Sequence, residues 1–289
     1  VCTWNRAEIL KHALISLVSQ DFREKYEVVV IDNNSTDHTP SIVKEMMNTH
    51  GAILRYAKEE KQGLSHARNR GIKEAMGDIL AFIDDDSWAD PGWIQNLFTT
   101  FSNGERIGVV GGRILLEWPG VPIPGWLTEN LYPSLGLFDL GKSETIEISN
   151  YCEFPHGSNI AFLKDAIIEE KLFDTTIGRN QFNLLAGEEN EACRSLCLKG
   201  WKIMYNPRAV VYHRVLPGRL NKEYFLNFYR GQGVTFAIVD SKLGLSFLRR
   251  IGKYIYKLIM SILVLLKNIG RKDGRFLAYL YIVSSIASI

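Results

Sequence analysis

Short apolar runs alternate with amphipathic segments along the first hundred residues. Residues 26–34 (YEVVVIDNN) and 78–86 (DILAFIDDD) are continuous apolar runs of strand length that end in polar residues, as is typical of strands buried on both faces. Residues 7–20 carry apolar side chains at helical spacing, and residues 52–57 form another short apolar run. Further helices are expected at residues 35–50, 64–76 and 90–101. This alternation predicts an α/β domain with a doubly wound, mostly parallel, Rossmann-like sheet.

The middle of the chain is less regular. Residues 105–150 are rich in Gly, Pro and Trp, and they predict a strand followed by a long loop over the sheet. A strand and the start of a helix are expected at residues 158–167, a helix at 187–200 and a last strand region at 202–215. We therefore predict one sheet domain over residues 1–217.

The composition changes from residue 218 onward. Residues 218–275 contain 12 Lys and Arg against 3 Asp and Glu, although the whole chain has a formal net charge of only +2. The apolar stretches 254–266 and 276–289 are each shorter than the roughly 20 residues that a membrane-spanning helix needs. Buried helices, interfacial helices and a re-entrant hairpin all fit this pattern. The basic flanks favour interfacial attachment, so residues 218–289 are expected to form a helical region associated with an anionic membrane surface.

The cysteines indicate the redox state of the cellular compartment, and the first residues indicate how the chain starts. The four cysteines are too scattered for a disulfide framework, and a reducing compartment fits best. Cys193 and Cys197 are expected on one face of a helix as small core side chains. No signal peptide is visible, and Val1 resembles the end of a strand, so further upstream residues are expected.

Polar residues follow the predicted strands, where ligands bind in open parallel sheets. These clusters are at residues 3–6, 31–37 and 83–87. The adjacent carboxylates Asp84, Asp85 and Asp86 repel one another, and a turn or helix cap needs only one such residue. A divalent cation such as Mn²⁺ or Mg²⁺ would offset the repulsion, whereas a solvated acidic turn is the simpler alternative. In an extended run side chains alternate, so we expect Asp84 and Asp86 on one side and Asp85 on the other.

Six segments occur in an order and spacing that resemble one enzyme family. They are TWNRAE, VVVIDNNSTDHT, GLSHARNRG, AFIDDDSWADPGW, HGSNIAF and GEENEACRSLCLKGWKI. Over about residues 1–215 the chain resembles family 2 glycosyltransferases, which are inverting enzymes with a GT-A fold. The resemblance implies transfer of a sugar from a nucleoside-diphosphate sugar, most often a UDP-sugar, with Mn²⁺ or Mg²⁺ as the cofactor.

The resemblance also implies site residues. It assigns donor binding to Thr3, Asn5, Glu8, Asp32, Arg68, Asp84, Asp85, Gly157, Ser158 and Asn159. Within that set, Asp32 resembles the residue that binds the base, and Asp84 the residue that holds the ribose. Metal binding falls to Asp86 and His213, although a lone histidine after a strand is more often a satisfied surface or core group.

The catalytic base is expected at the start of the helix at 187–200. An inverting transfer needs a carboxylate that removes the acceptor proton as the oxygen attacks. The family usually has Glu-Asp here, with the aspartate as base, whereas this chain has Glu188 and Glu189. Glu189 aligns with the base, and the choice between the two glutamates stays open. Glu191 is expected to be an ordinary charge on the helix surface.

The function we expect is transfer of one sugar to a saccharide or lipid-linked acceptor in bacterial surface polysaccharide synthesis, at the cytoplasmic face of the membrane. The Gln-x-x-Arg-Trp signature of processive relatives is absent, and residues 122–141 resemble bacterial exopolysaccharide glycosyltransferases. Alternatives are a polyprenyl-phosphate glycosyltransferase and a non-catalytic sugar-nucleotide-binding protein. A nucleotidyltransferase is disfavoured because residues 1–8 lack a Gly-rich phosphate loop. No nucleic-acid partner is expected.

Overall fold

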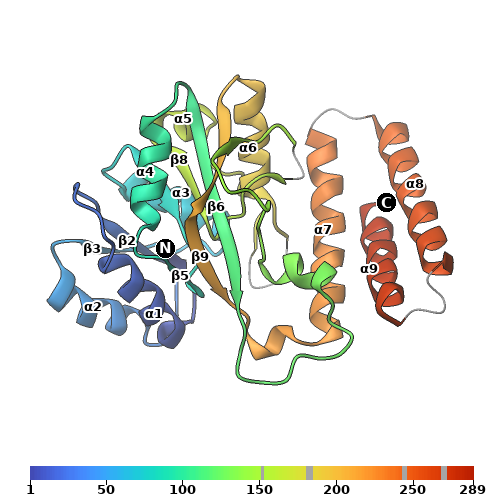
Figure 1. Cartoon of the computed structure of the whole chain (residues 1–289), viewed down its shortest axis with the longest axis horizontal. Coiled ribbons are helices and arrows are strands. Elements are labelled where there is room, and N and C mark those ends of the chain that lie inside the picture. The colour runs from blue at the N-terminus through green and yellow to red at the C-terminus, as the bar shows by residue number, and fades with distance from the viewer. Residues whose placement is uncertain (151–152, 180–184, 243–245, 268–271) are drawn as a thin grey trace. The chain divides into compact units, whose positions relative to one another are not determined.

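The computed structural model describes residues 1–150, 153–179, 185–242, 246–267 and 272–289 (Figure 1). The chain divides into two compact units. The first, here the sheet unit, consists of Val1–Glu117, Gly136–Thr176 and Glu188–Arg214. The second, here the helical unit, consists of Trp118–Leu135, Ile177–Gly187 and Val215–Ile289. The domain boundary expected at residue 217 stays a prediction.

The first part of the sheet unit is the predicted strand–helix alternation. Its strands are β1 (Cys2–Thr3), β2 (Val28–Asp32) and β3 (Leu54–Lys58), which pair in parallel in that order. Its helices are α1 (Ala7–Val18), α2 (Thr39–His50) and α3 (Leu64–Glu74). The apolar sides of α1 and β2 are fully buried at residues such as Leu10 and Val30, which explains the continuous apolar runs.

The second sheet of this unit is mixed. Its strands are β4 (Ile79–Phe82), β5 (Ser87–Ala89), β6 (Ile107–Glu117), β7 (Ile146–Glu147), β8 (Ile160–Leu163) and β9 (Lys202–Arg214). They run in the order β4-β8-β6-β9-β5, with β7 paired to β9. Only β6 and β9 pair in parallel, and the other pairings are antiparallel. The apolar pattern predicted most of these strands but not their direction, because burial on both faces occurs in either pairing.

Three more helices pack in the sheet unit. They are α4 (Trp93–Ser102), α5 (Lys164–Glu169) and α6 (Glu188–Leu198). Cys193 of α6 is fully buried, and Cys197 packs against the same core, so the predicted role of these cysteines as core side chains is confirmed.

The helical unit contains α7 (Lys222–Lys242), α8 (Phe247–Lys267) and α9 (Lys272–Ser288), of which α7 and α8 each pack on α9 (Figure 1). Helices α7 and α9 approach closely at Gly233, where an added Cβ would lie 2.2 Å from the carbonyl oxygen of Ser284. The helical region expected at residues 218–289 includes α7, but the sequence pattern did not predict the bounds of this helix, which carries two glycines and many polar residues. Among the described residues, no helix is both long and apolar enough to cross a membrane.

Asn159 joins three parts of the sheet unit just before β8. Its Nδ2 donates hydrogen bonds to the carbonyl oxygens of Arg113 in β6 and Ala209 in β9, at 2.9 and 2.8 Å. Its Oδ1 accepts a hydrogen bond of 2.8 Å from the indole of Trp93 in α4. Because the side chain is completely buried, water cannot replace these bonds.

We expect Asn159→Ala to lower the free energy of unfolding by about 2–4 kcal/mol, because it leaves a buried indole N–H and two buried carbonyl groups without their partner. Chemical denaturation monitored by circular dichroism measures this change. Asn48→Ala is the matched control, since Asn48 is exposed on α2. Equal stability of the two variants would show that Asn159 does not tie the strands together.

Candidate functional site

The three aspartates form a turn after β4. The backbone N–H of Ser87 donates to the carbonyl oxygen of Asp84 at 3.1 Å, which closes the turn and starts β5. The expected extended run is therefore wrong at this point. A turn replaces the strand because the chain has to reverse before β5 pairs antiparallel with β9.

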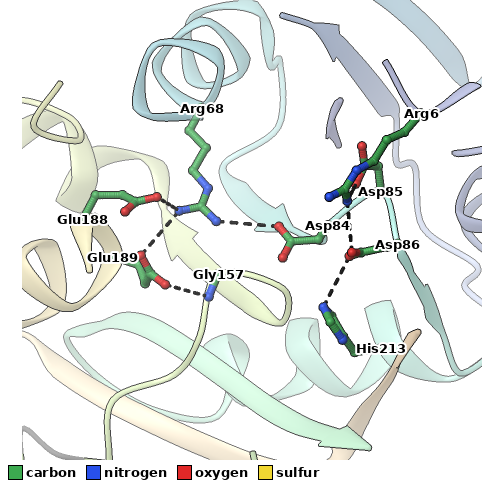
Figure 2. A network of polar contacts seen from close by, with 9 residues as sticks. All are labelled: Arg6, Arg68, Asp84, Asp85, Asp86, Gly157, Glu188, Glu189 and His213. Atoms are coloured by element: carbon green, nitrogen blue, oxygen red, sulfur yellow. Dashed lines mark hydrogen bonds and ion pairs between the residues drawn. The ribbon is translucent and has the colours of Figure 1, made fainter. Parts of the chain in front are cut away.

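Arg6 contacts two of the three carboxylates. Its Nη1 lies 2.8 Å from Oδ1 of Asp85 and 3.0 Å from Oδ2 of Asp86, as Figure 2 shows. Asp85 and Asp86 thus share one cation, and the alternation expected for an extended run does not hold. Burial raises the pKa of Asp85 to about 6, while the charge of Arg6 acts in the opposite direction.

Asp84, Asp86 and His213 form a group that could hold a metal ion. Each offers one ligand atom, and these atoms lie within 4.8 Å of one another. His213 comes from β9, opposite Ser87 of β5, and its Nε2 is 3.3 Å from Oδ1 of Asp86. Two carboxylates and one imidazole suit Mn²⁺ or Mg²⁺, so the donor set fits the predicted cofactor.

Gly136 packs against the imidazole ring of His213. Gly136 has φ +109°, and an added Cβ there would lie 2.9 Å from Nδ1 of His213. A side chain at this position would therefore be strained and would displace the imidazole.

Arg68 is the centre of a second charged cluster. It lies in α3 with 3% exposure, and its Nη1 donates to Oε1 of Glu188 at 2.6 Å. The same nitrogen is 3.5 Å from Oε2 of Glu189, and Nη2 is 3.8 Å from Oδ1 of Asp84 (Figure 2). Asp84 therefore lies between this cluster and the metal-ligand group.

Gly157 packs directly against this guanidinium. An added Cβ would lie 2.0 Å from Nη2 of Arg68, so only glycine fits here without displacing the arginine. The backbone N–H of Gly157 donates to Oε1 of Glu189 at 3.2 Å. The glycine thus allows the close approach of Arg68 and orients one of the two glutamates.

The two glutamates of α6 differ in exposure. The side chain of Glu188 is 2% exposed and forms the shorter contact with Arg68, whereas that of Glu189 is 13% exposed. Burial alone would raise the pKa of Glu189, but the charge of Arg68, hydrogen bonds from backbone N–H groups and the nearby His156 together outweigh it, and the pKa is lowered. Glu189 is therefore a carboxylate at neutral pH and is the more accessible of the pair.

Thr3 and Asp32 lie opposite each other at the carboxyl ends of β1 and β2. Asp32 is fully buried, and its two oxygens accept hydrogen bonds from the N–H of Ser35 at 2.8 Å and the hydroxyl of Tyr56 at 2.7 Å. Burial and the adjacent Asp32 carboxylate raise the pKa of Tyr56. The hydroxyl therefore stays protonated and holds Asp32 in place.

Asn5 and Glu8 are exposed near the same edge. Asn5 has φ +52°, and its Oδ1 accepts a hydrogen bond of 2.7 Å from the N–H of Thr36. Glu8 lies in the first turn of α1 and contacts His38 at 3.1 Å. The expected donor-binding residues Ser158 and Asn159 are buried, as Asp32 and Arg68 are, and Asn159 is occupied by the strand contacts described above.

Sequence reasoning missed Arg6 and Tyr56 as parts of the site. Arg6 is the last residue of the polar cluster at residues 3–6, and a cation there is the partner that two buried carboxylates require. The positive charge of Arg6 was the sequence signal that could have identified it as part of the site. Tyr56 lies within an apolar strand, and only the register of β2 with β3 brings it to Asp32.

The chain is similar to known glycosyltransferases. It is 28% identical to the glucosyl-dolichyl phosphate glucuronosyltransferase of Haloferax volcanii over 237 residues, which span 80% of this chain and 74% of the relative. It is 24% identical to the chondroitin synthase of Escherichia coli over 265 residues, 83% of this chain but only 37% of that enzyme.

A solved structure supports the fold. The mannosyltransferase from Pyrobaculum calidifontis in complex with GDP-Man and Mn²⁺ matches with a TM-score of 0.65 and 17% identity, over 99% of this chain and 85% of that one. The predicted GT-A fold is confirmed. The model of the family described as "Glycosyl transferase family 2" matches residues 1–167, more than half of the chain. The protein is therefore a glycosyltransferase, and it belongs to glycosyl transferase family 2.

Proposed function

We propose that the chain is a metal-dependent inverting enzyme that transfers one sugar from a nucleoside-diphosphate sugar, with UDP-sugar as the preferred donor. The observation that carries this proposal is the pair of clusters joined by Asp84. One offers carboxylates and an imidazole for a divalent ion, and the other offers a buried arginine beside two glutamates. A diphosphate needs cationic partners, and an acceptor needs a carboxylate close by.

The donor is bound by residues from both clusters in this proposal. Asp86 and His213 hold a Mn²⁺ or Mg²⁺ ion, which would stabilise the charge on the departing diphosphate. Arg68 supplies a fixed positive charge, and its burial makes that charge effective at short range. Asp84 is assigned to the ribose and Asp85 to the support of the acidic turn.

The nucleoside is assigned to the edge formed by β1 and β2. Thr3, Asn5 and Asp32 lie there, with Glu8 on the neighbouring turn of α1. Gly157 and Ser158 are assigned to the segment that lies beside the donor sugar. Asn159 serves this segment by holding it to the strands, because its side-chain amide is already occupied.

Glu189 is the proposed base. It is the more exposed of the two glutamates, it is deprotonated at neutral pH, and the N–H of Gly157 orients it. It removes the proton of the acceptor hydroxyl as that oxygen attacks the anomeric carbon. Glu188 is the closer partner of Arg68, and its burial argues against a role as base.

The acceptor is proposed to be a saccharide or a lipid-linked sugar in bacterial surface polysaccharide synthesis. The names of the relatives include one enzyme that acts on a lipid-linked sugar and one polysaccharide synthase. A location at the cytoplasmic face of a membrane accords with such an acceptor. Assays with polyprenyl phosphate and with saccharide acceptors would distinguish this proposal from polyprenyl-phosphate glycosylation.

We expect Asp86→Asn to abolish the Mn²⁺-dependent part of UDP binding, since it removes the charged ligand that the proposal assigns to the ion. Isothermal titration with UDP, with and without Mn²⁺, measures this loss. Asp165→Asn is the control, because Asp165 is an exposed aspartate of α5. Unchanged Mn²⁺-dependent affinity in Asp86→Asn would remove Asp86 from the metal site.

We expect Glu189→Gln to retain donor affinity and to lower the transfer rate by about 100-fold or more, because the amide cannot accept the acceptor proton. Glu188→Gln should weaken donor binding instead, since it loosens Arg68. Single-turnover transfer and UDP titration on both variants separate these effects. If Glu189→Gln transfers sugar at the normal rate while Glu188→Gln does not, the base is Glu188.

A further inference from the structure

Helix α8 exposes a long apolar stripe. Leu248, Ile255, Ile259, Ile262 and Leu266 are spaced by seven, four, three and four residues, which places them on one side of an α-helix. Each of them is at least 40% exposed. A stripe of this length is uncommon on a surface that faces only water.

The side of α8 next to this stripe faces its neighbours in the helical unit. Tyr254 is 1% exposed, and Leu258, Ser261 and Leu265 are partly buried at the spacing of one helix face. Helix α8 packs against α9, so this inner face is already satisfied. The exposed stripe is therefore a second apolar surface that α9 does not cover.

The charges of α8 have one sign. The helix carries Arg249, Arg250, Lys253, Lys257 and Lys267, and it contains no Asp or Glu. Lys253 forms an ion pair with Asp240 of α7. Arg249 and Lys267 lie near the two ends of the helix and are both exposed.

We propose that α8 lies flat in the surface of a membrane that contains anionic lipids, with the Leu248–Leu266 stripe in the acyl-chain boundary and the cations among the headgroups. Helices with one apolar face, a cationic polar face and aromatic residues near the boundary bind in this way, and Tyr256 is an exposed aromatic here. The 21 residues of α8 would extend over about 30 Å in the membrane plane.

The charge pattern argues against a second copy of α8 as the occupant. The cations lie on the sides of α8 away from the stripe, and α8 carries no acidic residue, so two helices packed through their stripes would gain no pairing between opposite charges. An anionic headgroup layer supplies the opposite charge at every position along the helix. This inference deepens the proposed location at a membrane and rests on it, but it does not depend on the transfer chemistry.

The test is co-sedimentation of the full chain with vesicles of phosphatidylcholine alone or with 30% phosphatidylglycerol, a fraction of about a third being enough to charge the surface. The assay contains no donor, metal or acceptor. Ile259→Gln should weaken binding to the anionic vesicles about tenfold or more, since a buried Ile side chain supplies much of the apolar contact. Ile168→Gln is the matched control, because Ile168 of α5 is also 51% exposed.

A second pair of variants tests the charge. The double change Arg249→Gln with Lys267→Gln should weaken binding to anionic vesicles about tenfold or more and leave binding to neutral vesicles unchanged. Lys44→Gln, on the exposed side of α2, is the control. Thermal melts of every variant verify that the helical unit stays folded.

Three results would overturn the proposal. The wild-type chain could fail to bind either vesicle, the Ile259 and Ile168 variants could bind equally, or sedimentation could show that Ile259→Gln dissociates a dimer instead. UDP titration on the same variants separates this failure from that of the proposed function. A chain that binds UDP with Mn²⁺ but no vesicles loses only the membrane inference.

Discussion

The buried positive charge of Arg68 is the interaction on which the rest of the site depends. An arginine or a carboxylate removed from water alone costs several kcal/mol, so each must be placed against the other. Arg68 satisfies this requirement with Glu188, Glu189 and Asp84. The ion pair with Glu188 joins residues 120 positions apart, which brings α3 and α6 together. Gly157 completes the arrangement because any larger residue would occupy the space of the guanidinium.

A second arginine provides a cationic partner for the carboxylates of the acidic turn. Arg6 lies against Asp85 and Asp86, and Asp86 also faces His213. The three aspartates are thus divided between two arginines, with Asp84 nearer to Arg68 (Figure 2). A divalent ion at Asp84, Asp86 and His213 would add charge between the two clusters. The two arginines therefore offset part of the negative charge of the acidic turn, and Arg68 is also shared with Glu188 and Glu189.

Hydropathy did not distinguish between the possible arrangements of the apolar segments in the helical unit. Apolar content alone left buried, interfacial and re-entrant arrangements open for residues 254–266, because all three need the same side chains. In the structure Tyr254 is enclosed, while Ile259 and its neighbours on the stripe are exposed. The bounds of α7 within the expected helical region were not predicted, because Gly233, a poor helix former, is present for close packing against α9.

The sequence by itself determined the α/β alternation and the family, and it named most of the candidate site residues, because short apolar runs and clusters of charged residues are local signals. Only the tertiary structure decided how these residues work together. Because β5 pairs with β9, the aspartates form a turn and not an extended run. The approach of α3 to α6 places Glu188 closer to Arg68 and leaves Glu189 more exposed. The register of β2 and β3 brought Tyr56 to Asp32. Strand direction, register and the partner of a buried charge depend on contacts between distant residues, which no local pattern contains.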